Sequence, residues 1–203
     1  DALPGVAPRL VGGEVVLVVG MPASGKSTIA ADYVERGYLR LNRDELGGKL
    51  SGIARMLDRE LAAGADRVIV DNTYGTRATR AAVVEIARRH NVVIRCIVMN
   101  TTIEDAQHNA VSRILARHGR LLGPDELKRA NRSDPNTFAP AAQFRWRRDY
   151  EPPRADEGFD AIESIVFTRA IMGARPALIV ELDDVVWSGR PRTPAEIALL
   201  PGA

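Results

Sequence analysis

The segment Gly20-Met-Pro-Ala-Ser-Gly-Lys-Ser-Thr28 decides the fold of this chain. It matches the pattern G-x-x-x-x-G-K-[ST] in full, and it lies between an apolar run typical of a buried strand and a stretch that predicts a helix. Glycines let the backbone curl so that successive amides point inward, and the N-terminus of the helix adds positive potential. The segment therefore predicts a loop that holds phosphate groups.

The residues of this loop predict a nucleotide and a metal ion. Lys26 is expected to reach the β- and γ-phosphates of a nucleoside triphosphate, and the hydroxyl of Ser27 is expected to bind Mg²⁺. We expect ATP, or another nucleoside triphosphate, together with Mg²⁺ as cofactors. The residues expected to contact the nucleotide are Gly20, Ala23, Ser24, Gly25, Lys26, Ser27 and Thr28.

Strand-like and helix-like segments alternate along the chain, which predicts an α/β fold with a mainly parallel sheet flanked by helices. The fold class is thus a P-loop NTPase. One helix is expected over Glu45–Ala63 despite three glycines inside it. The expected strands are 14–19, 38–41, 68–70, 92–98 and 159–167, and the other expected helices are 26–35, 76–90, 104–118, a short one from 124, and 141–150.

The composition indicates a globular chain. It has 203 residues, of which 45% are hydrophobic, enough to bury a core. The single cysteine, Cys96, lies in an apolar run, which predicts a small core residue and a reduced, cytoplasmic setting. No apolar stretch approaches the roughly 18 residues of a membrane span, and the N-terminus lacks the order of a signal peptide, so we expect no membrane partner. Residues 1–12 are expected to form a linker.

Basic charge is distributed unevenly. The formal net charge is +2, and 25 of the 28 basic residues are arginine. Between Arg113 and Arg154 there are ten Lys or Arg against five Asp or Glu. Such a stretch is typical of a surface that attracts polyanions, although a solvated helical face explains the charges equally well.

The segment Leu41-Asn42-Arg43-Asp44 follows the second expected strand. In an open parallel sheet, ligands bind beyond the carboxyl ends of the strands, which would set Asp44 over the phosphate site from the acceptor side. A carboxylate there can accept the proton of an attacking hydroxyl, and Arg43 can bind an acceptor phosphate or pair with an acid. The alternative is that Asp44 only caps the next helix.

Asp71-Asn72-Thr73 ends the third expected strand and faces the same crevice. Asp71 is expected to hold water on Mg²⁺ or to orient the acceptor, and Thr73 to hydrogen-bond it. The alternative is a turn formed by Asp and Asn. No Cys, His and Asp cluster has the spacing of metal ligands, so no structural zinc is expected.

Taken together, these segments resemble the kinase domain of polynucleotide kinases, which are often fused to a 3′-phosphatase. The resemblance spans about Gly13 to Phe167, in the order of that family. It rests on the phosphate loop, Asn42-Arg43-Asp44, Asp71-Asn72-Thr73, Asp105-Ala-Gln-His108-Asn109, Arg147-Arg148-Asp-Tyr150-Glu151-Pro-Pro153 and Asp156-Glu157-Gly158-Phe159-Asp-Ala-Ile162.

The resemblance implies a fold like that of adenylate kinase with a helical lid. It further implies that Asp44 is the general base for a 5′-hydroxyl, and that Arg43 and Asp71 belong to the acceptor pocket. An arginine of the lid would clamp the ATP phosphates. We assign this role to Arg113, with Arg117 and Arg120 as rivals.

Two positions depart from the family pattern. Some relatives carry an arginine three residues after the catalytic aspartate, where this chain has Gly47. Strand type and end preference are therefore open. Family members also often show Asp-Asn-Thr-Asn, where the fourth residue here is Tyr74. This tyrosine is either a stacking platform for a base or an ordinary turn residue.

The tail, 176–203, contains Ala177-Leu-Ile-Val-Glu181-Leu182-Asp183-Asp184, an apolar run that ends in acids. It resembles a degraded opening of a HAD-type phosphatase domain, with Glu181 where the nucleophilic Asp belongs. About 27 residues cannot bury a core of their own, so we expect a vestige or fragment without phosphatase activity. A phosphatase or ligase module in a longer parent chain is a candidate partner.

Three functions fit residues 13–175. The first is a kinase that transfers the γ-phosphate of ATP to the 5′-hydroxyl end of DNA or RNA, in nucleic-acid end repair. The second is a small-molecule hydroxyl kinase of the same fold, which would have no need of the extended basic stretch. The third is a non-catalytic, nucleotide-dependent module that binds nucleic acid, an interpretation in which Asp44 has little purpose.

Overall fold

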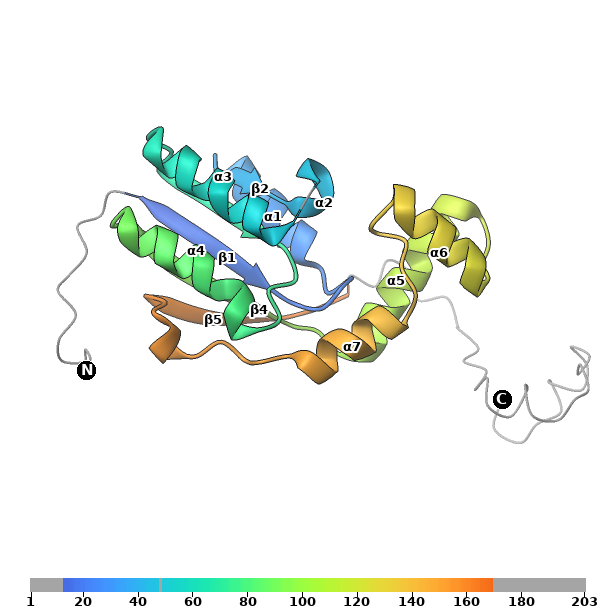
Figure 1. Cartoon of the computed structure of the whole chain (residues 1–203). Coiled ribbons are helices and arrows are strands. Elements are labelled where there is room, and N and C mark those ends of the chain that lie inside the picture. The colour runs from blue at the N-terminus through green and yellow to red at the C-terminus, as the bar shows by residue number, and fades with distance from the viewer. Residues whose placement is uncertain (1–12, 48, 170–203) are drawn as a thin grey trace, which may run out of the picture. The chain divides into compact units, whose positions relative to one another are not determined.

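The fold is built on a five-stranded parallel sheet. The structure is a computed structural model that describes residues 13–47 and 49–169. The strands are arranged in the order β2-β3-β1-β4-β5, and Figure 1 labels β1, β2, β4 and β5. This arrangement confirms the predicted α/β class and the parallel sheet. The strands are β1 (Glu14–Val19), β2 (Leu39–Leu41), β3 (Arg67–Asp71), β4 (Val93–Asn100) and β5 (Ala161–Val166).

β1 lies at the centre of the sheet and pairs with β3 on one side and β4 on the other. Its residues from Val15 to Val19 are fully buried. Because successive strand residues point to opposite faces, Val16 and Val18 pack in one core cluster, whereas the alternate residues of β1 pack in another. This burial on both faces explains why the strand is a continuous apolar run.

Helices cover both faces of the sheet. α3 and α4 cover the face that includes Leu17, since their apolar residues belong to the same cluster. α1 covers the other face through Ala30 and Tyr33. These helices are α1 (Lys26–Glu35), α3 (Leu50–Ala62) and α4 (Arg77–Arg89).

The remaining helices gather at the carboxyl end of the sheet. α5 (Ile103–His118) follows β4, and α6 (Pro124–Ser133) and α7 (Ala141–Asp149) come next in the chain. Figure 1 shows these three beyond the arrowhead of β1, in the position expected of a helical lid. A short 3-10 helix, η1 (Ala155–Glu157), precedes β5.

The prediction of one helix over Glu45–Ala63 is wrong, because the structure has two helices in this region. α2 (Arg43–Leu46) ends at Gly47, and α3 begins only at Leu50. Gly47 has φ of 75°, a positive value that glycine adopts at little cost and that takes the backbone out of the helix. Gly52 lies within α3 and does not interrupt it.

Contacts divide the chain into two units, 1–167 and 168–203, and all elements above belong to the first. The expected linker, 1–12, and the tail that resembles a phosphatase opening lie outside the described residues. Cys96 is fully buried, which confirms it as a core residue. Within 13–47 and 49–169, the helices are too short or too polar to span a bilayer.

Candidate active site

The phosphate loop connects β1 to α1 and has the backbone of an anion cradle. Ala23 and Gly25 have φ of 64° and 92°, so the chain turns sharply just before the helix. Gly25 is the N-cap of α1, no side chain caps this helix, and its first turn contains no acid. The first amides of α1 therefore lack an intrahelical acceptor, and they suit a phosphate group.

Side chains from within the loop and from distant segments fix the carbonyls of the phosphate loop. Four successive carbonyl oxygens accept hydrogen bonds from side chains. The donors are Lys26 Nζ to Met21 (2.7 Å), Gln143 Nε2 to Pro22 (3.1 Å), Asn109 Nδ2 to Ala23 (3.0 Å) and Thr101 Oγ1 to Ser24 (2.8 Å). Lys26 belongs to the loop itself, whereas the other three donors come from α7, α5 and the segment after β4, so three distant parts of the chain help to fix the shape of the loop.

Gly20 is required by close packing. A Cβ atom there would lie 2.5 Å from Ser24 Oγ and 2.9 Å from Met99 Cβ. Ser24 Oγ itself is buried without a hydrogen-bond partner among the described residues. Because buried hydroxyls in proteins nearly always have a partner, this one fits a site that a polar ligand completes, as does the cradle of amides beside it.

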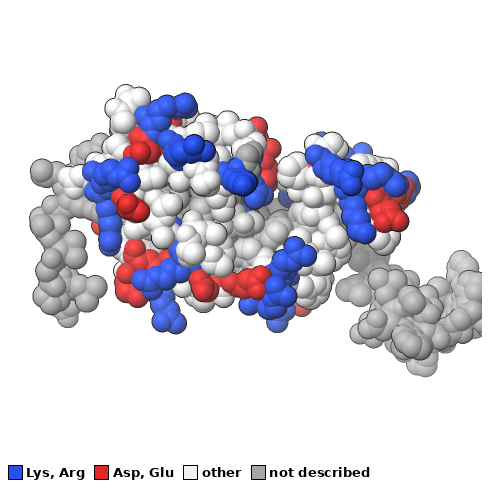
Figure 2. Space-filling model, viewed as in Figure 1, with Lys and Arg blue, Asp and Glu red and all other residues white. Residues whose placement is uncertain are grey.

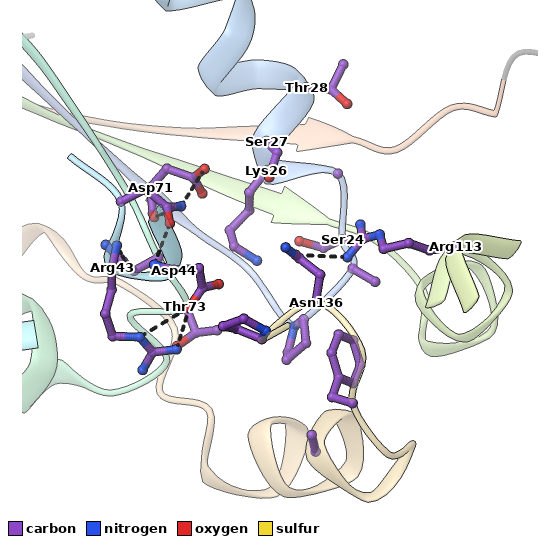
Figure 3. A pocket seen from close by; sticks show the side chains of 18 of the residues that line it. Ser24, Lys26, Ser27, Thr28, Arg43, Asp44, Asp71, Thr73, Arg113 and Asn136 are labelled. Atoms are coloured by element: carbon purple, nitrogen blue, oxygen red, sulfur yellow. Dashed lines mark hydrogen bonds and ion pairs between the residues drawn. The ribbon is translucent and has the colours of Figure 1, made fainter. Parts of the chain in front are cut away.

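The ammonium group of Lys26 interacts electrostatically with charged side chains on several sides of the pocket. Burial lowers the pKa of Lys26 to about 8, the carboxylates of Asp71 and Asp44 act to raise it, and Arg113 acts to lower it. Figure 3 shows its side chain pointing between Asp44 and Ser24. Two carboxylates and an arginine therefore act on one ammonium group.

Asp44 lies in the first turn of α2, in the same pocket as the phosphate loop. It is not the cap of the helix: the N-cap is Asn42, whose Oδ1 accepts hydrogen bonds from the backbone amides of Asp44 (2.7 Å) and Glu45 (3.3 Å). The alternative role of Asp44 as a helix cap is therefore wrong. Its side chain is one-third exposed and pairs with Arg43 Nη2 at 3.0 Å.

Asp71, the last residue of β3, is almost fully buried. Its Oδ2 atom accepts hydrogen bonds from Arg40 Nη2 (2.5 Å) and Asn42 Nδ2 (3.1 Å). Asp71 lines the pocket beside Ser27 and Thr73. Arg40 was not identified from the sequence, although an arginine in a short, half-buried strand is a signal that a carboxylate lies nearby.

The loop after β3 is anchored by its carbonyls. Thr73 O accepts from Trp146 Nε1 (3.3 Å), and Tyr74 O accepts from Arg80 Nη1 (3.1 Å). Tyr74 is 1% exposed and has φ of 37°. Its ring is part of the core, so the alternative role of Tyr74 as a platform for a base is wrong.

Among the three lid arginines, only Arg113 lines the pocket. Arg113 Nη1 donates to Asn136 Oδ1 at 3.2 Å, a contact that Figure 3 shows at the far side of the pocket from Asp44. Arg117 pairs with Asp134 at 2.7 Å, and Arg120 pairs with Glu126 at 2.6 Å. The structure thus places Arg113, the residue chosen from the sequence, in the pocket, whereas its two rivals do not line it.

The basic stretch is partly neutralised. Four of its acids pair with its own cations, for example Arg148 with Asp149. Within the described ranges no ion pair involves Arg129, Arg132, Arg145 or Arg147. Figure 2 shows Lys and Arg side chains gathered over the lobe that contains α6.

The pocket has a volume of about 280 Å³. Of the residues that the sequence assigned to the site, all but Gly20 line this pocket. Thr28 lies at its edge, and Figure 3 shows its side chain turned away. Residues missed by sequence reasoning also line it, and they come from the phosphate loop, the segments around α2 and β3, and the lid. They are Pro22, Asn42, Asn72, Asn131, Pro135, Asn136, Phe138 and Ala142.

A family comparison agrees with this geometry. The model of the AAA domain family matches residues 15–152. The chain belongs to this family.

This AAA domain is similar in sequence to a curated enzyme. The bifunctional polynucleotide phosphatase/kinase of Schizosaccharomyces pombe is 31% identical over 156 residues, which make up 76% of this chain and 34% of that protein. This confirms the resemblance to polynucleotide kinases. The chain spans about a third of the length of the curated relatives it matches.

A solved structure supports the fold of the AAA domain. Kti12 of Chaetomium thermophilum, in complex with ADP-AlF3, has a TM-score of 0.54 and 17% identity, and the match covers 75% of this chain and 89% of that one. This likeness shows a shared fold, and together with the AAA domain match it confirms the predicted P-loop fold.

The AAA domain offers few protein ligands for a metal. In the described part of the chain, no group of three or more His, Cys, Asp or Glu is placed to hold an ion. Ser27 and Asp71 both line the pocket. Such a sparse oxygen donor set fits Mg²⁺, which commonly binds through one or two protein oxygens together with substrate phosphates.

Proposed function

We propose that this domain transfers the γ-phosphoryl group of ATP, or another nucleoside triphosphate, to the 5′-hydroxyl end of DNA or RNA. One observation carries the proposal: Asp44 and the phosphate loop line the same pocket. A carboxylate that does not act through Mg²⁺ repels phosphates and does not favour nucleotide binding, whereas it can deprotonate an alcohol.

The transfer requires one bond to form and one to break. The acceptor oxygen attacks the γ-phosphorus, and its proton passes to the carboxylate of Asp44. The bond between the γ-phosphorus and the β–γ bridging oxygen breaks, and ADP leaves with that electron pair. Arg113 and Lys26 would stabilise the charge that spreads over the transferred group.

The acceptor half of the pocket supplies the other contacts. Arg43 would contact the acceptor, with Asp71 and Thr73 beside it. Ser27 would hold Mg²⁺ directly, with Asp71 holding its water. When bound, the ion neutralises charge on the β- and γ-phosphates.

Two further observations favour a polynucleotide over a small molecule. The polynucleotide phosphatase/kinase relative aligns over 76% of this chain. The lid also carries Arg129, Arg132, Arg145 and Arg147, which make no ion pair within the described residues. Such cations suit a strand of phosphates. The setting we infer is the repair of nucleic-acid ends in the cytoplasm.

The test is transfer of label from γ-labelled ATP to a panel of 5′-hydroxyl acceptors. The panel contains single-stranded and recessed DNA ends, matching RNA ends, and free nucleosides and sugars. We expect labelled oligonucleotides with the wild type. No labelled oligonucleotide under any condition would overturn the proposal, and label on a sugar or nucleoside alone would favour a small-molecule kinase.

The substitution Asp44→Asn tests the assigned base. It keeps the shape of the side chain but removes the carboxylate. We expect kcat to fall by about 10²- to 10⁴-fold, the range for a general base, while the Kd for ATP stays unchanged. Asp32→Asn, at an exposed carboxylate of α1 outside the pocket, is the control for the loss of one negative charge. Full turnover by Asp44→Asn would exclude it as the base.

A further inference from the structure

The helix that carries Asp44 is not held by the hydrophobic core. α2 has four residues, none of which is buried, and Leu46 is 49% exposed. A helix of one turn is unstable by itself. The position of Asp44 must therefore be set by polar contacts to the rest of the domain.

Those contacts converge on the end of β3. Asn42 Nδ2 donates to the backbone oxygen of Asp71 at 2.7 Å. The backbone amide of Arg43 donates to Asn72 Oδ1 at 3.0 Å. Both contacts hold the start of α2, and neither reaches its second half.

Arg40 reaches that second half. Its Nη1 atom lies 2.7 Å from Glu45 Oε1, and its Nη2 atom lies 2.5 Å from Asp71 Oδ2. The Arg40 side chain is 20% exposed and that of Asp71 is 2% exposed. One guanidinium thus joins α2 to β3. Its contact with Asp71 is largely desolvated, so that ion pair is less screened than one at the surface, whereas the Glu45 side chain is 59% exposed.

We propose that Arg40 is a positioning residue for the transfer reaction: by bridging Glu45 and Asp71, it fixes α2 and so holds Asp44 toward the phosphate loop. This inference rests on the proposed function. Arginine suits the role because its planar fork binds two carboxylates at once, whereas the ammonium of lysine is a single point charge. Arg40 touches neither the acceptor nor the nucleotide in this arrangement, since it does not line the pocket.

The first test is Arg40→Gln, which removes the charge and the fork. We expect kcat to fall about 10- to 100-fold, because small misplacements of a reacting group are costly, while KM for ATP changes less than about threefold. Arg40→Lys should restore part of the loss. The matched control is Arg67→Gln, at the opposite end of β3, where the side chain is exposed and donates to Arg36 O at 3.4 Å.

The second test separates positioning from a general structural effect. If Arg40 acts through Asp44, the two substitutions should not be additive. Asp44→Asn should then lower kcat by a smaller factor in the Arg40→Gln background than in the wild type. The difference should equal the factor by which Arg40→Gln alone lowers kcat. An equal loss of kcat from Asp44→Asn in both backgrounds would overturn the proposal. So would unchanged kcat in Arg40→Gln.

A third measurement does not depend on activity. Hydrogen exchange of the amides in 43–46 should become faster in Arg40→Gln, while exchange in β1 stays as in the wild type. If the wild type transfers no phosphate to any hydroxyl, the proposed function fails, and faster exchange still supports the bridge. If the wild type is active and exchange in 43–46 is unchanged, the bridge fails and the proposed function stands.

Discussion

The two halves of the pocket are held in different ways. On the nucleotide side, β1 is buried on both faces, and three carbonyls of the phosphate loop accept hydrogen bonds from distant parts of the chain. On the acceptor side, α2 has no buried residue and depends on a few polar bridges. Substitutions at the buried anchors of the pocket should therefore reduce stability, whereas substitutions around α2 should change the rate and leave the fold intact.

The largest effect is expected at a buried anchor, Arg80, which holds the loop after β3. Its side chain is fully buried and makes two hydrogen bonds to Glu157, at 2.7 and 2.6 Å. Arg80→Met leaves Glu157 unpaired, which should lower the free energy of unfolding by about 3–5 kcal/mol. Urea unfolding followed by circular dichroism measures it.

The control for Arg80 lies on the same helix. Arg77 pairs with Asp156 at 2.8 Å, but both side chains are more than half exposed. Arg77→Met should therefore lower the free energy of unfolding by about 1 kcal/mol or less. Equal losses for the two variants would contradict the assignment of Arg80 as the buried anchor.

The next effect in size is expected at the lid, where the rate rather than the fold should respond. Arg113→Gln should lower kcat by about 10²-fold, the size expected when a donor to a developing charge is lost. Arg117→Gln, which removes the partner of Asp134, should change kcat less than about threefold. Steady-state kinetics with saturating ATP measures both, and the reverse order would assign the clamp to Arg117.

A smaller effect is expected from the titration of Lys26 on the nucleotide side. Because burial lowers its pKa to about 8, the side chain loses its proton as the pH rises through that value, while a bound triphosphate favours the ammonium form. Nucleotide affinity should therefore fall about tenfold between pH 7 and 9, and binding at pH 8.5 should take up protons. Calorimetry in buffers of different ionisation enthalpy measures the uptake.

Lys26→Arg provides the comparison, since arginine stays charged throughout this range. Its nucleotide affinity should not depend on pH between 7 and 9. A pH dependence equal to that of the wild type would show that another group titrates.

The smallest effect is expected at Tyr74. Since its ring is 1% exposed, Tyr74→Phe should leave KM for an oligonucleotide acceptor within about twofold of the wild type, as for a residue that makes no contact with the substrate. A rise of KM with kcat unchanged would show that the hydroxyl of Tyr74 contacts the acceptor.

The sequence predicted the features that depend on neighbouring residues. The phosphate loop is a run of consecutive positions, and Asp44 and Asp71 follow from the rule that ligands meet the carboxyl ends of parallel strands. Each strand of the sheet overlaps a segment expected to be a strand, and the buried strands β1 and β4 follow from apolar runs. These are properties of one segment or of a general fold rule.

Features that join distant segments were not predictable. The bridge from Arg40 to Asp71 crosses 31 positions, and Gln143 reaches Pro22 across 121. Arg113 and Arg117 lie one helical turn apart, so periodicity cannot separate them, and a later segment that pairs with Arg117 makes the difference. The break after α2 depends on the positive φ of Gly47. The sequence alone does not show which glycine breaks the helix, because Gly52 lies within α3 without interrupting it.

The position of β1 has a consequence for synthesis of the chain. Its two neighbours in the sheet, β3 and β4, are made much later, ending at Asp71 and Asn100. Parallel pairing of this kind joins distant segments and is slow to form. On the ribosome, the phosphate loop therefore emerges long before the strands that support it, and the ability to bind nucleotide should arise only after β4 has left the exit tunnel.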